Sequence, residues 1–187
     1  YNNTTGSYNV AGGRLALYTA TTADNNTALG FGALQVNTTG HSNVAVGAYS
    51  LDGNTTANNN TAIGYAALTA NSTGADNTAV GYQSLQTCST GGSNVSVGFK
   101  ALLSNTTGQY NTSVGAQSLY NNTTASNNTA LGYNALHNNT TGTSNVAIGN
   151  QALDANTTGS QLVAMGHNAL GSNTTASDNT AIGHASL

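Results

Sequence analysis

The chain lacks most of the residues from which soluble proteins build surfaces and sites. Its 187 residues include no proline, tryptophan or glutamate, and only 4% of them are charged, against about 25% in a typical soluble domain. The two cations, Arg14 and Lys100, cannot supply the many phosphate contacts of a nucleic-acid-binding protein. They cannot form a polybasic membrane-binding patch either. The composition therefore excludes nucleic acid and charge-driven membrane contact as partners.

Cysteine and long hydrophobic runs are also scarce. Cys88 is the only cysteine, which excludes an intrachain disulfide framework and a cysteine-based zinc site. No apolar run approaches the roughly 20 residues of a membrane-spanning helix, so we expect no membrane insertion. No signal peptide is recognisable. We expect the chain to be a segment of a longer fibre.

What the chain does have is a strict internal repeat. A glycine follows a short apolar run every 17 residues, without insertion or deletion. These glycines are Gly13, Gly30, Gly47, Gly64, Gly81, Gly98, Gly115, Gly132, Gly149, Gly166 and Gly183. We therefore expect a single repeat domain over 1–187 with eleven units. The units are 1–17, 18–34, 35–51, 52–68, 69–85, 86–102, 103–119, 120–136, 137–153, 154–170 and 171–187.

We number the 17 positions of each unit from Tyr1, so that the unit reads x-x-N-T-T-G-x-x-N-T-A-I-G-x-x-A-L. Position 5 is always threonine, position 13 always glycine and position 17 always leucine. Position 11 is alanine or serine. Position 9 is asparagine except at Leu162, and position 3 is asparagine except at Ala20 and Cys88. Such constancy within one chain indicates that every unit meets the same physical environment.

The length and pattern of the unit predict its fold. Helical repeats need about 33 residues or more for two helices, whereas the run N-[TV]-A-[ILV]-G alternates with the period of a strand. One unit of about 56 Å contour closes into one narrow coil, and eleven coils stacked at about 4.8 Å make a rod roughly 50 Å long. The fold class is thus predicted as an all-β, parallel β-solenoid (β-roll or β-helix) of eleven 17-residue coils. A single coil is too thin to stand alone, and we expect the rod in a homotrimeric or otherwise polymeric fibre.

The alternation also suggests which side chains face inward. Position 12 is bulky and apolar in ten units, from Leu29 to Ile182, and we expect this row to fill the coil interior together with the leucines of position 17. The small residues of positions 11 and 13 would then allow another backbone to approach closely, across the coil or from another chain. The asparagines of positions 3 and 9 and the threonines of position 5 are predicted to form ladders along the rod.

These repeats carry a resemblance. The unit "NTAIGYxAL-xx-NTTG-xx" resembles the repeat stalk of bacterial and phage tail-fibre-like proteins, and the resemblance covers the whole chain. The cores "NVAVG" and "NTAIG" are also similar to the "SVAIG" core of the β-roll in the heads of trimeric autotransporter adhesins, which have a shorter repeat. The resemblance implies a trimeric fibre on a cell surface or virion that attaches to other surfaces. The intramolecular chaperone that often ends such chains is not among these residues.

The sequence offers no catalytic constellation of paired carboxylates or Ser-His-Asp spacing, so we expect no enzyme and no cofactor. His167 and His184 share position 14 in successive coils and could hold a metal ion, although position 14 also accepts unrelated residues. We favour a variable outward position over a metal site.

Two other sets of residues are candidates for recognition or modification. Position 14 is often aromatic, which could create a strip for glycans or a partner protein or merely a packing surface, the interpretation that we favour. The strip comprises Phe31, Tyr65, Tyr82, Phe99 and Tyr133. Nine units contain an N-x-[ST] glycosylation sequence that starts at position 3. The competing explanation of this motif is a turn in which the asparagine side chain is hydrogen-bonded. The asparagines of the motif are Asn3, Asn37, Asn54, Asn71, Asn105, Asn122, Asn139, Asn156 and Asn173.

Three functions follow from these features. A structural extracellular fibre or stalk, carrying or acting as an adhesin, is the leading hypothesis, with copies of the same chain and cell-surface glycans as partners. An ice-binding β-solenoid is a second, because Thr5 and its equivalents form an unbroken row beside another hydroxyl at position 4. The third is a carbohydrate-binding shaft that uses the position-14 aromatic residues.

Overall fold

The computed structural model describes residues 2–187, in which every regular element is a three-residue β-strand and no helix occurs. The strands are β1 (Val10–Gly12), β2 (Thr27–Leu29), β3 (Val44–Val46), β4 (Thr61–Ile63), β5 (Thr78–Val80), β6 (Val95–Val97), β7 (Thr112–Val114), β8 (Thr129–Leu131), β9 (Val146–Ile148), β10 (Val163–Met165) and β11 (Thr180–Ile182). Each strand covers positions 10 to 12 of its unit, the place where the sequence alternation predicted it.

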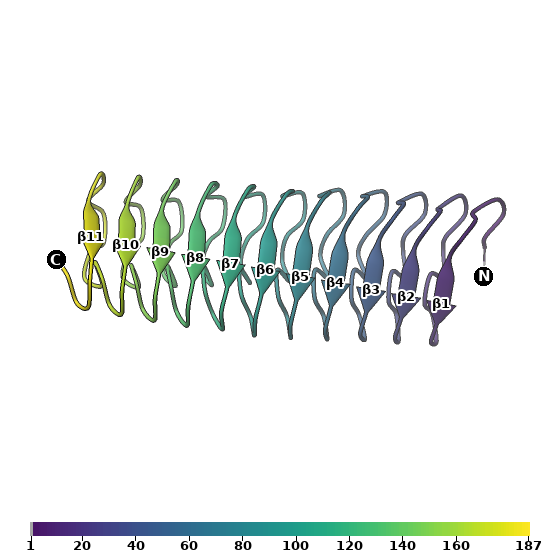
Figure 1. Cartoon of the computed structure of the whole chain (residues 1–187). Coiled ribbons are helices and arrows are strands. Elements are labelled where there is room, and N and C mark those ends of the chain that lie inside the picture. The colour runs from purple at the N-terminus through teal and green to yellow at the C-terminus, as the bar shows by residue number, and fades with distance from the viewer. Residues whose placement is uncertain (1) are drawn as a thin grey trace.

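The strands form one parallel sheet in sequence order, from β1 to β11. Each residue pairs with its equivalent 17 residues later, as Thr61 does with Thr78 and Ile63 with Val80. The chain therefore winds as a rod of stacked coils with its two termini at opposite ends (Figure 1). This confirms the predicted parallel β-solenoid with a 17-residue turn. We call the coils 1 to 11 in chain order.

Each coil closes through four residues with positive φ. In coil 5 these are Asp76 (61°), Gly81 (131°), Gln83 (53°) and Leu85 (52°), at positions 8, 13, 15 and 17. A left-handed conformation costs a residue with a Cβ about 1–2 kcal/mol, and the position-17 leucine adopts it in every coil. The burial of that leucine, described below, offsets the cost.

The invariant glycine of position 13 has a second cause besides its φ. A Cβ on Gly81 would lie 2.5 Å from the carbonyl oxygen of Gly98, the equivalent glycine of the next coil. Another backbone does approach closely at this position, but it belongs to the next coil along the rod, and not to the opposite side of the coil or to another chain as predicted.

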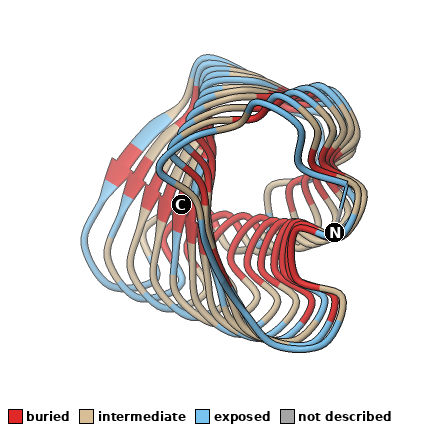
Figure 2. Cartoon of the chain, turned by 90° about the vertical axis from the view of Figure 1, so that its right-hand side faces the viewer, coloured by how far each residue is buried: buried red, intermediate tan, exposed pale blue. Residues whose placement is uncertain are grey.

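The prediction for the strand interior was wrong in its direction. The small residue of position 11 faces inward, and Ala62 is 0% exposed, whereas Ile63 at position 12 is 41% exposed. In β2 to β11 the middle residue is buried and the two end residues are more exposed, and the buried part of the strands is visible in the view along the rod (Figure 2). In most coils the narrow interior holds a leucine and two asparagines, so opposite them only alanine or serine fits.

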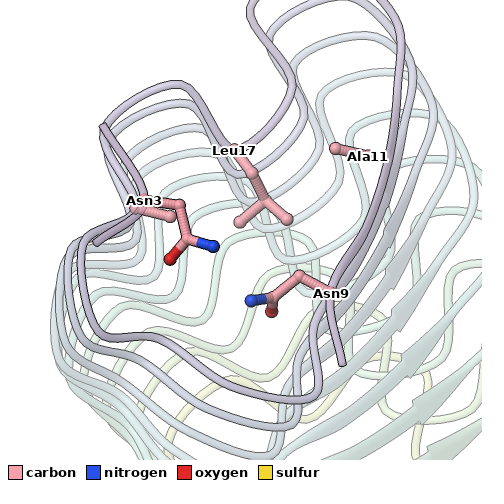
Figure 3. A pocket seen from close by; sticks show the side chains of 5 residues that line it. Asn3, Asn9, Ala11 and Leu17 are labelled. Atoms are coloured by element: carbon pink, nitrogen blue, oxygen red, sulfur yellow. The ribbon is translucent and has the colours of Figure 1, made fainter. Parts of the chain in front are cut away.

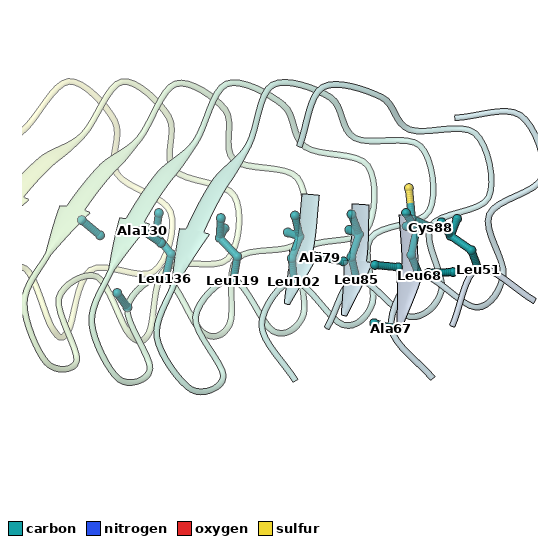
Figure 4. Close-up of a cluster of buried hydrophobic side chains, with 14 of the residues drawn as sticks. Leu51, Ala67, Leu68, Ala79, Leu85, Cys88, Leu102, Leu119, Ala130 and Leu136 are labelled. Carbon is teal, nitrogen blue, oxygen red and sulfur yellow. The ribbon is translucent and has the colours of Figure 1, made fainter. Parts of the chain in front are cut away.

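The prediction for position 17 was correct. The leucines of coils 2 to 9 are fully buried and stack above one another along the core (Figure 4). Burial of each such side chain contributes about 1.5–3 kcal/mol. The hydrophobic core is thus a file of leucines lined by alanines, continuous from coil to coil.

The predicted asparagine ladders exist and lie inside the coil. At position 3, Asn54 Nδ2 donates to Asn37 Oδ1 of the preceding coil at 2.8 Å and to Ala57 O at 3.1 Å. At position 9, Asn43 N donates to Asn26 Oδ1 at 3.0 Å, and Asn43 Nδ2 donates to the same Ala57 O at 2.9 Å. In coils 3 to 5 and 7 to 10 the position-6 carbonyl is therefore held by both ladders, which satisfies buried backbone and side-chain groups together.

The hydroxyl ladder belongs to position 4 and not to position 5. Thr38 Oγ1 donates to Thr55 O at 3.0 Å, and Thr55 Oγ1 donates to Ser72 O at 3.1 Å. The threonines of position 5, such as Thr39 and Thr56, are exposed in every coil. The prediction of a position-5 ladder was wrong because the chain turns between the two residues and sends only the first hydroxyl toward the next coil.

Candidate functional site

The predicted glycosylation asparagines are mostly inside the solenoid. The seven at positions 37, 54, 71, 105, 122, 139 and 156 are 0% exposed, and their Nδ2 atoms donate to the position-6 carbonyl of the same turn. Asn3 is exposed and Asn173 is half-buried, in the first and last coils. A glycan on any of the seven would have to displace a buried hydrogen bond and the wall of the coil. The structure thus favours the hydrogen-bonded turn over modification in the folded rod.

The position-14 aromatic residues do lie on the outside, and a residue that the sequence interpretation missed joins them. Tyr49, at position 15, bridges Phe31 and Tyr65, with ring centroids 5.2 and 5.9 Å away and near-perpendicular ring planes. Tyr65, Tyr82 and Phe99 continue the strip as parallel stacked rings at 5.4 and 5.6 Å. We call these five residues the aromatic ladder, which spans coils 2 to 6.

Tyr49 could have been found from two local features of the sequence. Its coil carries the small Ala48 at position 14, so the aromatic residue has moved by one position. In the preceding coil Gly32 stands at position 15, and Tyr49 Cδ1 lies 3.4 Å from the place of a Cβ there. The missing side chain leaves room for the ring. Tyr133, in coil 8, is exposed and outside the ladder.

The geometry of the ladder decides what its rings can offer. The stacked planes of Tyr65, Tyr82 and Phe99 differ by only 12°, so their faces are turned toward one another along the rod. A sugar that stacks on an aromatic side chain needs a free ring face, and this ladder presents mainly edges and phenol hydroxyls. The arrangement favours a packing role, in which contacts between rings of neighbouring coils stabilise the stack.

Both cations of the chain lie at the ends of the aromatic ladder. The Arg14 guanidinium carbon is 5.8 Å from the Phe31 ring centroid, and Lys100 Nζ is 5.3 Å from that of Phe99. A cation within about 6 Å of a ring centroid is attracted to the ring, by about 0.5–1 kcal/mol at exposed sites. The two basic residues therefore cap the ladder and are not free to form a basic patch.

The candidate metal pair is close together but has no further ligand nearby. His167 and His184 stack with ring centroids 5.0 Å apart, as their shared position predicted, and both are exposed. Among residues 2–187 no group of three or more histidine, cysteine, aspartate or glutamate side chains could hold a metal ion. The stacked pair is explained by repetition of one outward position.

Two of the other ionisable side chains, Asp24 and His41, take part in hydrogen bonds between coils. Asp24 Oδ1 accepts from Ser7 N at 2.6 Å, and His41 Nδ1 accepts from Asp24 N at 3.1 Å. Burial raises the pKa of Asp52 and of Asp154, and the positive charge of His137 partly opposes the rise for Asp154. We assign none of these groups to a reaction.

A hollow of about 230 Å³ opens at the N-terminal end of the rod and is lined by Asn3, Asn9, Ala11, Leu17 and Ala20 (Figure 3). These residues occupy the interior positions 3, 9, 11 and 17, which in the following coils pack against the next coil. The hollow is therefore the end of the coil interior and has the chemistry of the core.

One further surface is the outer face of the sheet, which we call the sheet face and define as positions 10 and 12 of all eleven strands. Position 10 is threonine or valine, and position 12 is leucine, valine, isoleucine or methionine except at Gly12. Every one of these residues is exposed or half-buried. Sequence reasoning missed this surface because the inward direction was assigned to the bulkier row.

Comparison with protein-family models, curated proteins and solved structures gave no match to this chain. In the described residues no helix is long and apolar enough to cross a membrane. Assignment of a function therefore rests on the geometry of the rod and its surfaces.

Proposed function

We propose that the chain is the shaft of an extracellular fibre, of the kind found on bacterial surfaces or phage tails, that carries or acts as an adhesin. The observation that supports it is the uninterrupted stack of eleven coils in one parallel register. Each coil presents the same interior to its neighbours, so length is set by coil number and can grow without a new kind of contact.

The distribution of constant and variable residues supports the same conclusion. The constant positions 13 and 17 and the nearly constant positions 3 and 9 close or fill the coil. Positions 7, 8, 14 and 15 vary freely and face outward in most coils. A shaft needs its interior to repeat and tolerates variation outside, whereas an enzyme needs one coil that differs from the others. In the assembled fibre we expect several copies of the chain, three if the resemblance to tail-fibre stalks holds.

Immunogold electron microscopy tests the location and role. Antibodies raised against the folded chain should label thin fibres on intact cells or particles that produce it, without permeabilisation. Labelling that appears only after permeabilisation would contradict the proposal.

The shaft geometry has its own test. A tandem duplication of the chain continues the 17-residue period and should give a rod about 50 Å longer at unchanged diameter, because each added coil contributes about 4.8 Å. Small-angle X-ray scattering measures both dimensions. Two separate compact bodies in place of one longer rod would refute the shaft.

A second candidate function is ice binding. The observation that favours it concerns the sheet face, and not the rows of positions 4 and 5 on which the sequence-based hypothesis relied. Outward residues two apart on a strand, such as Thr78 and Val80, form two parallel rows on the sheet face, an alternation that the adjacent hydroxyls of positions 4 and 5 do not provide. Thermal hysteresis of a solution of the chain tests this candidate. A freezing point equal to the melting point would remove it.

A further inference from the structure

The sheet face is a mostly apolar surface, with threonine at position 10 of six strands, and nothing among residues 2–187 covers it. Ile63 and Leu29 are exposed to about the extent of the ladder aromatics, at 41% and 42%, although isoleucine and leucine are usually buried. The strands beneath are only three residues long and regularly paired, so the outward rows lie on a continuous sheet. An extended apolar row of this kind is not required by the fold, because the inward residues alone close the coil.

No residue of the sheet face is charged. The five aspartates occupy positions 1, 7 and 8, and the two cations occupy positions 14 and 15. An ordinary solvent-facing sheet alternates apolar inward and polar outward residues. Here the larger apolar residue faces outward and the smaller one inward, the reverse of what water contact favours. The face also extends over all eleven strands of the sheet without interruption by a charge.

The dimensions of the sheet face suit a protein interface. Eleven strands at about 4.8 Å spacing extend over about 48 Å, and two rows of side chains cover a strip roughly 12 Å wide, or about 550 Å². Two such faces in contact would bury about 1,100 Å², above the threshold of about 1,000 Å² for a specific interface. Its area lies at the upper end of the range of about 300–600 Å² for the largest apolar patch of a monomer, a patch that is often functional.

The spacing of the repeat indicates which partner fits the sheet face. Side chains on the sheet face recur with the spacing of the coils, and only a surface with the same spacing can interdigitate along the full length without accumulating misfit. A second copy of the chain has that spacing by construction, and it also lacks charge on the same face. We propose that copies of this chain associate side by side through their sheet faces. The inference rests on the proposed shaft, of which it identifies the lateral interface.

Paired lysine substitutions provide the test. In Ile63→Lys with Val97→Lys, two charges enter the sheet face in coils 4 and 6, two coils apart, so that they repel each other little. The matched control is Thr56→Lys with Thr90→Lys, which places the same charges on position 5 of the same coils, where the threonines are exposed. Both variants change the formal net charge from −3 to −1. Circular dichroism checks that each variant folds.

Sedimentation velocity over a range of concentrations reads out the association. We expect the unsubstituted chain and the position-5 control to form an oligomer, and the sheet-face variant to bind its own copies at least about 100-fold more weakly, since an unpaired charge is costly to bury. A third variant, Thr61→Val with Thr78→Val, should bind at least as tightly as the unsubstituted chain because it keeps the shape of the face and makes it more apolar.

Two outcomes would overturn the inference. The unsubstituted chain could sediment as a monomer at all concentrations, or the position-5 control could dissociate the oligomer while the sheet-face variant leaves it intact. Either outcome leaves the shaft itself standing if the tandem duplication still lengthens the rod. If the duplicated chain fails to lengthen while the sheet-face variant still dissociates the oligomer, the shaft falls and the interface remains.

Discussion

Replacement of Cys88 by asparagine should stabilise the rod, because Cys88 interrupts the position-3 ladder. In the neighbouring coils each asparagine donates to the one before, as Asn71 Nδ2 does to Asn54 Oδ1 at 3.0 Å. At coil 6 the thiol cannot replace that donor, and Asn71 Oδ1 is buried without a hydrogen-bond partner. On the other side, Asn105 Nδ2 keeps its bond to Gly108 O, but its ladder bond is made only to Cys88 Sγ, at 3.8 Å. One substitution would restore both bonds.

The magnitude follows from the two bonds. An unsatisfied buried acceptor costs about 1–3 kcal/mol, and the bond to sulfur is weaker than the amide bond that would replace it. The thiol's own bond to Gly91 O is not lost, since asparagine makes the equivalent bond in other coils. Cys88→Asn should therefore raise the free energy of unfolding by about 1–3 kcal/mol. At about 2–4 °C per kcal/mol for a chain of this size, the midpoint would rise by about 2–12 °C.

Urea and thermal unfolding followed by circular dichroism measure the change, with Cys88→Ala as the control that removes the thiol but leaves Asn71 Oδ1 unpaired. We expect the alanine variant to be less stable than the unsubstituted chain. Should the asparagine variant be no more stable than the unsubstituted chain, the orphan acceptor would not be the defect that we infer.

The same substitution changes the response to alkaline pH. Burial raises the pKa of the Cys88 thiol from 9.0 to about 11, a rise that bonds from Asn105 and with Gly91 partly oppose. Below pH 9 both folded and unfolded chains keep the proton, and between about 9 and 11 only the unfolded chain loses it. The unsubstituted chain should thus lose stability through this window, whereas the asparagine variant should lack that component.

Three further changes test the interior and its charges. Gly81→Ala places a Cβ 2.5 Å from Gly98 O at a φ of 131°, and should cost at least about 3 kcal/mol in urea unfolding; a loss below 1 kcal/mol would show that the coils can separate there. Leu85→Ala empties one place in the leucine file and should cost about 2–5 kcal/mol, with a near-neutral result arguing against a tightly packed core. Asp52→Asn should stabilise the fold at neutral pH but not in acid. Burial raises the Asp52 pKa, so the folded chain favours the protonated carboxyl over the charged carboxylate. The stability that the protonated carboxyl contributes is lost as the pH rises through the folded pKa, whereas asparagine stays uncharged. An equal effect at pH 3 and pH 7 would contradict that cause.

The sequence by itself determined the architecture. A strict period without insertions requires that residues 17 apart meet the same surroundings, and the two-residue alternation at positions 10 to 12 located every strand. The constant leucine of position 17 was correctly assigned to the core, and the constant glycine of position 13 to a close backbone contact, although its partner is the next coil and not the opposite wall or another chain. The two asparagine rows were correctly predicted as ladders, since identical amides stacked one coil apart can bond to each other.

Only the tertiary structure decided which face of each strand points inward. Alternation distinguishes two faces but does not orient them, and the rule that bulky residues go inside fails where the interior is already filled by Leu85 and by the asparagines of positions 3 and 9. The same filling buries Asn71 and its equivalents, which the N-x-[ST] pattern alone presents as accessible. It was also the folded coil that brought Tyr49 into the aromatic ladder, because neighbours on an outer surface depend on how the chain turns at positions 13 to 15. Repetition along the sequence determines which residues of neighbouring coils stack on each other, whereas packing within one coil determines which side chains remain on the outside for a partner.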